Sequence, residues 1–171
     1  MSPRPVPHVA AAFIRRGDEV LLVRQAAPGE EPFWSVPGGA LEDGELVHEG
    51  LAREVLEETG LEIAGLRVAY IRQIDNRRAE QLHRGRGGHG VGYLVTVWVF
   101  EVESWTGELE VRDPDGFVSE ARFVAAAEAA ELLEQTHWLR PAAAYLRGEL
   151  EPGSLHLERW HEDGRIERAV R

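Results

Sequence analysis

The segment from Gly39 to Leu61 constrains the fold more than any other part of this 171-residue chain. Its apolar residues Val47, Leu51 and Val55 recur every four positions, which is the spacing of one face of an α-helix. Charged residues occupy many of the positions between them. The sequence therefore predicts an amphipathic helix over residues 46–59 that packs its apolar face on a core.

Both ends of this predicted helix carry boundary signals. Asp43 is of the residue type that caps a helix N-terminus, because its carboxylate accepts hydrogen bonds from exposed backbone N–H groups. Gly60 predicts the end of the helix, since glycine adopts the left-handed conformation at low cost. Just upstream, Pro37-Gly38-Gly39 predicts a turn in which backbone atoms approach a site that a side chain would otherwise obstruct.

Three glutamates share one edge of the predicted helix. Glu54, Glu57 and Glu58 stand at i, i+3 and i+4, and like charges at this spacing destabilise a helix unless something neutralises them. The chain has no cysteine, and its seven histidines are scattered, so oxygen ligands favour a hard ion such as Mg²⁺ or Mn²⁺. Arg53 neighbours these acids and is placed to orient one of them through a bidentate pair.

Predicted strands dominate the rest of the chain. They cover residues 8–14, 19–25, 33–36, 66–74, 91–102, 117–124, 155–160 and 166–170. Gly17-Asp18 predicts a hairpin between the first two, and Asp163-Gly164 predicts another between the last two. Further helices are predicted over residues 125–135 and 141–147. This order indicates an α/β fold of the α+β type, with a mixed sheet between helices, and excludes a helical bundle or a doubly wound parallel sheet.

Nine residues of the central segment stand at fixed spacings. They are Gly39, Glu45, Arg53, Glu54, Val55, Glu57, Glu58, Gly60 and Leu61. The pattern is a glycine, five residues, a glutamate, seven residues, Arg-Glu, an aliphatic residue, any residue, Glu-Glu, any residue, a glycine and an aliphatic residue. Without a gap, it resembles the signature of the Nudix hydrolase family. The placement of the outlying glycine, glutamate and arginine favours this interpretation over a solvated acidic helix face.

The resemblance implies a mixed β-sheet sandwiched between helices, with the signature forming a loop, a helix and a second loop. It covers roughly residues 7–147. We expect residues 1–148 to form a Nudix hydrolase domain, and residues 149–171 to form a C-terminal β-hairpin extension of the same domain. Members of the family hydrolyse a nucleoside diphosphate linked to another group, X, to a nucleoside monophosphate and phosphate-X. The implied partner is therefore a small nucleotide-type substrate.

The resemblance also implies roles for individual residues. Glu54 is the residue of the signature that is expected to help activate water, while Arg53 and Glu45 order the site. The implied cofactor is Mg²⁺ or Mn²⁺. Its implied ligands are the carboxylates of Glu54, Glu57 and Glu58 and the backbone carbonyl of Gly38.

Outside the signature, position and charge indicate further candidate metal-binding and substrate-binding residues. Glu120 lies about where relatives supply a further acidic metal ligand, with an exposed strand residue as the alternative. Arg24 ends a predicted strand and is a candidate phosphate contact, with a surface role as the alternative. Residues 72–89 carry five arginines and two acids in a chain that is otherwise acidic, so they form either a clasp for an anionic diphosphate or a surface loop. The candidate substrate-binding arginines there are Arg77, Arg78, Arg84 and Arg86.

Charge and hydropathy limit the other partners. A formal net charge of −11 argues against nucleic acid, whose phosphates need a basic surface. The longest apolar run, residues 91–100, is too short to span a bilayer, and residues 1–7 lack the apolar region of a secretory signal. We therefore expect a cytoplasmic protein without a membrane partner. The hairpin over residues 155–170 is either a homodimer edge or an extra pair of strands.

Two rival functions come from the same fold. A nucleotide-sensing module that binds without turnover is the main alternative, and the intact signature favours hydrolysis over it. The related isomerase activity on isoprenoid diphosphates uses a cysteine, which this chain lacks. Neither Asn76 nor Arg77 is the proline or tyrosine that marks some substrate subfamilies, so the substrate within the class is left open.

Overall fold

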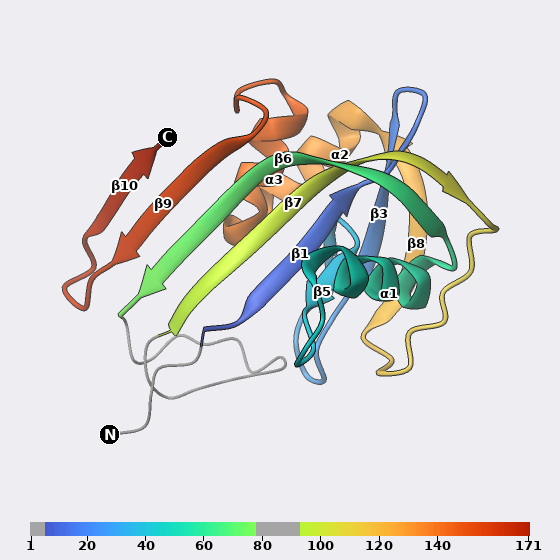
Figure 1. Cartoon of the computed structure of the whole chain (residues 1–171), viewed down its shortest axis with the longest axis horizontal. Coiled ribbons are helices and arrows are strands. Elements are labelled where there is room, and N and C mark those ends of the chain that lie inside the picture. The colour runs from blue at the N-terminus through green and yellow to red at the C-terminus, as the bar shows by residue number, and fades with distance from the viewer. Residues whose placement is uncertain (1–5, 78–92) are drawn as a thin grey trace.

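The computed structural model describes residues 6–77 and 93–171. In these residues, the strands form two sheets (Figure 1). The large sheet has the order β10-β9-β6-β7-β1-β5. Its strands are β1 (His8–Phe13), β5 (Gly38–Ala40), β6 (Glu62–Asn76), β7 (Tyr93–Thr106), β9 (Ser154–Trp160) and β10 (Ile166–Val170). The small sheet contains β2 (Arg15–Arg16), β3 (Glu19–Gln25), β4 (Phe33–Ser35) and β8 (Val118–Ala125).

The large sheet is mixed, as predicted. β1 pairs in parallel with β7, and β6 pairs in parallel with β9, whereas β6 and β7 are antiparallel. The helices are α1 (Val47–Thr59), α2 (Ala126–Glu134), α3 (Arg140–Leu146) and the 3₁₀ helix η1 (His137–Leu139). Figure 1 shows α1 on one side of the large sheet and α2 and α3 on the other. The predicted fold class is therefore confirmed. None of the helices in the described residues is long and apolar enough to cross a membrane.

Strand β1 connects the two layers of the core. Ala10 and Ala12 pack with Leu51 and Val55 of α1, while alternate residues of the strand, such as Ala11, face the α2 and α3 side. This division follows from the two-residue period of a strand. Leu51 and Val55 are fully buried, which confirms the predicted apolar face of the helix.

The predicted hairpin at Gly17-Asp18 is correct only in part. The turn joins β2 to β3, with Arg16 opposite Glu19, but β1 does not pair with β3. It lies instead between β7 and β5 in the large sheet. The physical reason is that residues 9–13 are apolar at every position, which suits a strand buried on both faces better than one strand of an exposed hairpin.

The start of α1 also differs from the prediction. The residue that precedes the helix is Leu46, and Asp43 lies outside the first turn. The Glu49 carboxylate accepts a hydrogen bond from the Leu46 N–H at 2.8 Å, so an acid inside the first turn replaces the predicted cap. The end is as predicted: Gly60 is left-handed, with a φ of 75°, and its N–H donates to a carbonyl of the last turn.

The C-terminal hairpin extends the large sheet by two strands. β9 and β10 are antiparallel neighbours, and β9 pairs with β6 over its whole length. Figure 1 shows the hairpin at one edge of the sheet, beside the long strand β6. The predicted pair of strands is therefore confirmed.

Candidate active site

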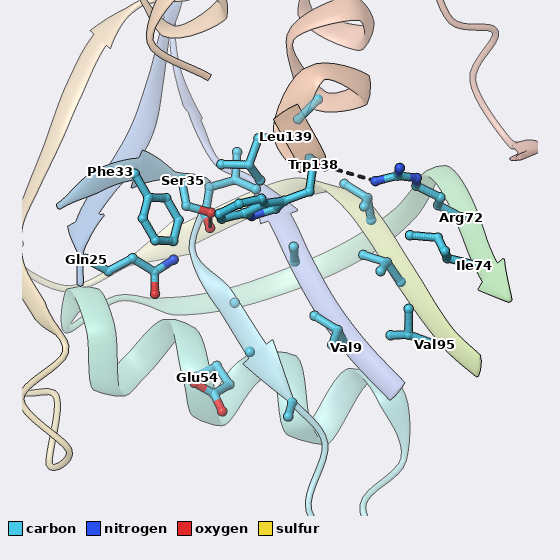
Figure 2. A pocket seen from close by; sticks show the side chains of 18 of the residues that line it. Val9, Gln25, Phe33, Ser35, Glu54, Arg72, Ile74, Val95, Trp138 and Leu139 are labelled. Atoms are coloured by element: carbon cyan, nitrogen blue, oxygen red, sulfur yellow. Dashed lines mark hydrogen bonds between the residues drawn. The ribbon is translucent and has the colours of Figure 1, made fainter. Parts of the chain in front are cut away.

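A cavity of about 500 Å³ lies between the large sheet, α1 and η1 (Figure 2). Its floor is apolar and comes from alternate residues of neighbouring strands, including Val9, Ile74 and Val95. Figure 2 shows Glu54 pointing toward the cavity from α1, and Trp138 lying across from it on η1. The cavity thus joins an acidic wall to an apolar floor.

The acidic wall consists of two buried carboxylates one helical turn apart. Glu54 and Glu58 both line the cavity and are only 4% and 5% exposed. The Gly38 N–H donates to Glu58 Oε2 at 2.9 Å and so fixes that carboxylate. Burying charged groups costs free energy unless hydrogen bonds or opposite charges compensate. The fold therefore holds both acids at the cavity at some cost to stability.

The glycine turn before α1 is required by close contacts. Gly38 has a φ of +146°, and a Cβ built there would lie 2.1 Å from the carbonyl oxygen of Ala10. A Cβ on Gly39 would lie 2.5 Å from the carboxyl carbon of Glu54. Only glycine fits at these positions without a shift of neighbouring atoms. The turn therefore brings backbone directly against the Glu54 carboxylate.

Arg53 holds the acids of the signature in place. Its Nε and Nη2 donate to the two carboxylate oxygens of Glu45 at 2.7 and 2.9 Å. Its Nη1 donates to Glu54 at 2.9 Å and to Glu57 at 3.4 Å, and Nη2 also donates to the Ala40 carbonyl. The hydrogen bond that Arg53 donates to Glu45 contributes most to raising the pKa of Arg53. Arg53 therefore cross-links the loop, the helix and β5.

The Arg53–Glu45 pair predicts a specific pH dependence of stability. The Arg53 guanidinium, helped by the Glu42 N–H, lowers the pKa of Glu45 from 4.5 to about 2. Because the folded pKa lies below the ordinary value, ionised Glu45 stabilises the fold above about pH 4.5 and loses this effect as pH falls to about 2. We expect the wild type to be more stable than Glu45→Gln at pH 7, and the difference to shrink between pH 4.5 and 2. Urea unfolding at several pH values measures the difference in the free energy of unfolding between the two proteins. If this difference stays constant down to pH 2.5, the Arg53–Glu45 pairing is refuted.

The donor set fits a hard divalent cation. Glu54, Glu58 and Gly38 line the cavity, and Glu57 lies beside them with its carboxylate near Arg53. Within residues 6–77 and 93–171, no three acidic or histidine side chains converge as a complete ligand set. Mg²⁺ commonly binds through one or two carboxylates and keeps water or phosphate oxygens as its other ligands. Two buried carboxylates beside an open cavity meet that requirement.

The candidates outside the signature lie elsewhere. Glu120 is exposed on β8, opposite Arg24 of β3, and its carboxylate is 3.6 Å from Arg122. Arg77 is 3.1 Å from the Asp75 carboxylate. None of Glu120, Arg24 and Arg77 is among the described residues that line the cavity. Arg78, Arg84 and Arg86 lie outside the described residues, and their contact with substrate stays a prediction.

The aromatic side of the cavity contains none of the predicted site residues. The rings of Phe33 and Trp138 meet edge to face, with centroids 5.3 Å apart. Trp160 and Arg72 also line the cavity. No motif marks these residues, because they come from β4, η1, β9 and β6 and meet only when the sheets are assembled. One signal was available: Trp138 stands in the short break between two predicted helices, where a large side chain is free to face a cavity.

Comparison with known proteins identifies the family. The sequence model of the NUDIX domain matches residues 4–147, which is most of the chain. This protein therefore belongs to the Nudix family.

Individual relatives agree with this assignment. The human protein 8-oxo-dGDP phosphatase NUDT18 is 45% identical over 52 residues, which is 30% of this chain and 16% of that protein. A MutT-like protein from Streptomyces ambofaciens is 44% identical over 52 residues, which is 32% of its length. The chain thus matches less than a third of either relative.

The fold is shared with a solved structure over nearly its whole length. The MutT protein from Bacillus halodurans superposes with a TM-score of 0.64, covering 96% of this chain and 97% of that one, at 19% sequence identity. At this level of identity, the similarity concerns the fold alone.

Proposed function

We propose that this chain is a metal-dependent hydrolase that cleaves the diphosphate linkage of a nucleoside diphosphate linked to a group X. The products would be a nucleoside monophosphate and phosphate-X. The observation that carries the proposal is that Glu54 and Glu58, both buried, line the same cavity as a broad apolar floor. A diphosphate bound to a divalent cation would fit the acidic end of the cavity, and a nucleoside would fit the apolar floor.

The residues of the signature would have different roles in the reaction. Glu54, Glu58 and the Gly38 carbonyl would hold Mg²⁺ or Mn²⁺ at the cavity. Glu57, whose carboxylate lies near Arg53, would turn toward the ion to complete the set. When bound, the ion supplies charge neutralisation for the diphosphate and lowers the pKa of a water ligand. Glu54 would accept a proton from the attacking water, since its carboxylate faces the cavity and is held by Arg53 at 2.9 Å. Glu45 keeps Arg53 in the orientation that this contact requires.

Metal dependence is the first test of the proposal. We expect excess EDTA to abolish hydrolysis and added Mg²⁺ or Mn²⁺ to restore it, because two buried carboxylates alone would repel an anionic diphosphate. Activity is followed as released nucleotide, and circular dichroism in EDTA serves as the control for folding. Full turnover in excess chelator would rule out a metal-dependent site.

The names of the relatives indicate which nucleobase and which group X to test first as parts of the substrate. The human relative is named an 8-oxo-dGDP phosphatase, so oxidised guanine nucleotides belong first in a substrate screen. ADP-ribose, nucleotide sugars and dinucleoside polyphosphates complete the screen, since they share the diphosphate linkage. A nucleotide-sensing role without turnover is the second candidate, and the same screen separates it through binding without cleavage.

A further inference from the structure

The C-terminal hairpin reaches the cavity, although it follows the last residue matched by the family model. In the parallel pairing of β6 with β9, Ile74 lies opposite Glu158 and Asn76 lies opposite Trp160. Ile74 and Asn76 line the cavity, and Trp160 lines it as well. Side chains at paired positions share one face of a sheet. Strand β9 therefore continues the cavity floor beyond β6.

A buried ion pair connects this hairpin to the floor. Arg72 Nε donates to Glu158 Oε1 at 2.8 Å, and the two side chains are 8% and 10% exposed. Trp160 Nε1 donates to the other carboxylate oxygen of Glu158 at 2.8 Å. A buried pair of this kind seldom stabilises a fold more than apolar residues of the same size would. Its presence beside a cavity suggests a role in positioning.

The same arginine reaches the opposite wall. Arg72 Nη1 donates to the backbone carbonyl of Trp138 at 3.0 Å, a contact drawn in Figure 2. Trp138 belongs to η1, a single turn with no buried residue and no side-chain cap at its N-terminus. Such a turn depends on contacts from outside for its position. Glu158 therefore acts on Trp138 through Arg72.

The charges indicate what this end of the cavity accepts. Glu158 neutralises Arg72, so the guanidinium is not available as a strong phosphate ligand. The surrounding surface is the indole of Trp138, the ring of Phe33 and apolar side chains of the floor. Such surfaces favour an uncharged planar group, which gains both apolar burial and ring contacts. The anionic end of a substrate belongs at the opposite wall, beside Glu54.

We propose that the C-terminal hairpin completes the substrate pocket, with Glu158 as a positioning residue that holds Trp138, through Arg72, against the nucleobase. Trp160 forms the end of the same pocket. This inference rests on the proposed function, because it takes the substrate to be a nucleotide. It also makes residues 149–171 part of the functional unit.

The test compares two ligands by isothermal titration calorimetry, guanosine monophosphate and ribose 5-phosphate, which differ in the planar base. We expect the wild type to bind the nucleotide more tightly than the sugar phosphate. Glu158→Gln should weaken nucleotide binding about tenfold, or about 1.4 kcal/mol, and should not weaken sugar phosphate binding. Glu167→Gln is the matched control, because Glu167 lies on β10 of the same hairpin and is exposed.

A second pair of variants separates ring contact from burial. Trp138→Phe keeps an aromatic surface and should retain most of the preference for the nucleotide, whereas Trp138→Leu should lose it. These variants leave the hairpin intact. They therefore test the contact between Trp138 and the nucleobase even if Glu158→Gln does not fold. With the best substrate, Glu158→Gln should raise KM about tenfold and change kcat less than twofold.

The outcomes distinguish this inference from the proposed function. Equal nucleotide affinity in the wild type and a folded Glu158→Gln protein would overturn the role of Glu158. No preference for the nucleotide over the sugar phosphate in the wild type would overturn the assignment of the base to this pocket. Nucleotide binding with the expected variant effects, but without cleavage of any diphosphate, would leave the pocket assignment standing and reject the hydrolase.

Discussion

Replacing Glu58 with glutamine is expected to lower kcat/KM at least tenfold while the protein stays folded. Glutamine is nearly isosteric, and its side-chain oxygen can still accept the hydrogen bond that Gly38 N–H donates to Glu58. The substitution therefore removes a charge and little else. A tenfold loss corresponds to about 1.4 kcal/mol of transition-state stabilisation.

The second part of the prediction concerns the stability of the Glu58→Gln protein. Glu58 is 5% exposed and one turn from the buried Glu54, so loss of its charge relieves both burial and repulsion. We expect the free energy of unfolding without metal to be unchanged or slightly higher. Glu62→Gln is the matched control, because Glu62 is an exposed acid just past α1. A Glu58→Gln protein that unfolds more easily but keeps full activity would contradict both halves.

Alanine at Gly39 is expected to lower activity, whereas alanine at Gly38 is expected to lower stability. At Gly39 the new Cβ meets the carboxylate of Glu54 at 2.5–2.7 Å, and that carboxylate is the far end of a flexible side chain. Glu54 is then displaced, and a shift of this size at a catalytic group costs on the order of 10²-fold in rate. The loss in the free energy of unfolding should be about 1 kcal/mol, because the new Cβ meets no backbone atom.

At Gly38 the new Cβ meets backbone instead. It would lie 2.1 Å from the Ala10 carbonyl oxygen, and the φ of +146° is strained for any residue with a side chain. We expect a loss of roughly 3 kcal/mol or more in the free energy of unfolding, since β1 and β5 must separate. Urea unfolding and kcat/KM, measured on both variants, provide the comparison. Equal destabilisation, or full activity of Gly39→Ala, would show that these contacts are not as described.

The acidic half of the site was predictable because it depends on local geometry. Spacings within one helix place Glu54 and Glu58 one turn apart whatever the rest of the chain does. The apolar positions Leu51 and Val55 lie next to them on the same buried face of α1. The predicted N-cap at Asp43 was wrong because two signals compete there. Glu49 lies within the first turn and reaches back to the chain before it, which Asp43 is too far away to do.

The apolar half was not predictable from local pattern. Trp138 meets Phe33 only because η1 packs over the sheets, and Arg72 meets Glu158 only through the register of β6 with β9. Arg72 and Glu158 are 86 residues apart in the sequence, so no local pattern predicts their contact. Charge alone favoured Arg77, which pairs with Asp75, whereas Arg72 of the same arginine-rich segment is the one that lines the cavity.

Product analysis of a nucleotide panel tests the central claim most directly. The wild type and Glu58→Gln are incubated with oxidised guanine nucleotides, ADP-ribose, nucleotide sugars and dinucleoside polyphosphates, with Mg²⁺ or with EDTA, and products are separated by anion exchange. The account predicts a nucleoside monophosphate and phosphate-X from at least one compound, formed only with metal and at least tenfold more slowly by Glu58→Gln. Nucleotide binding with no diphosphate cleaved anywhere in the panel would contradict it and favour a sensing module.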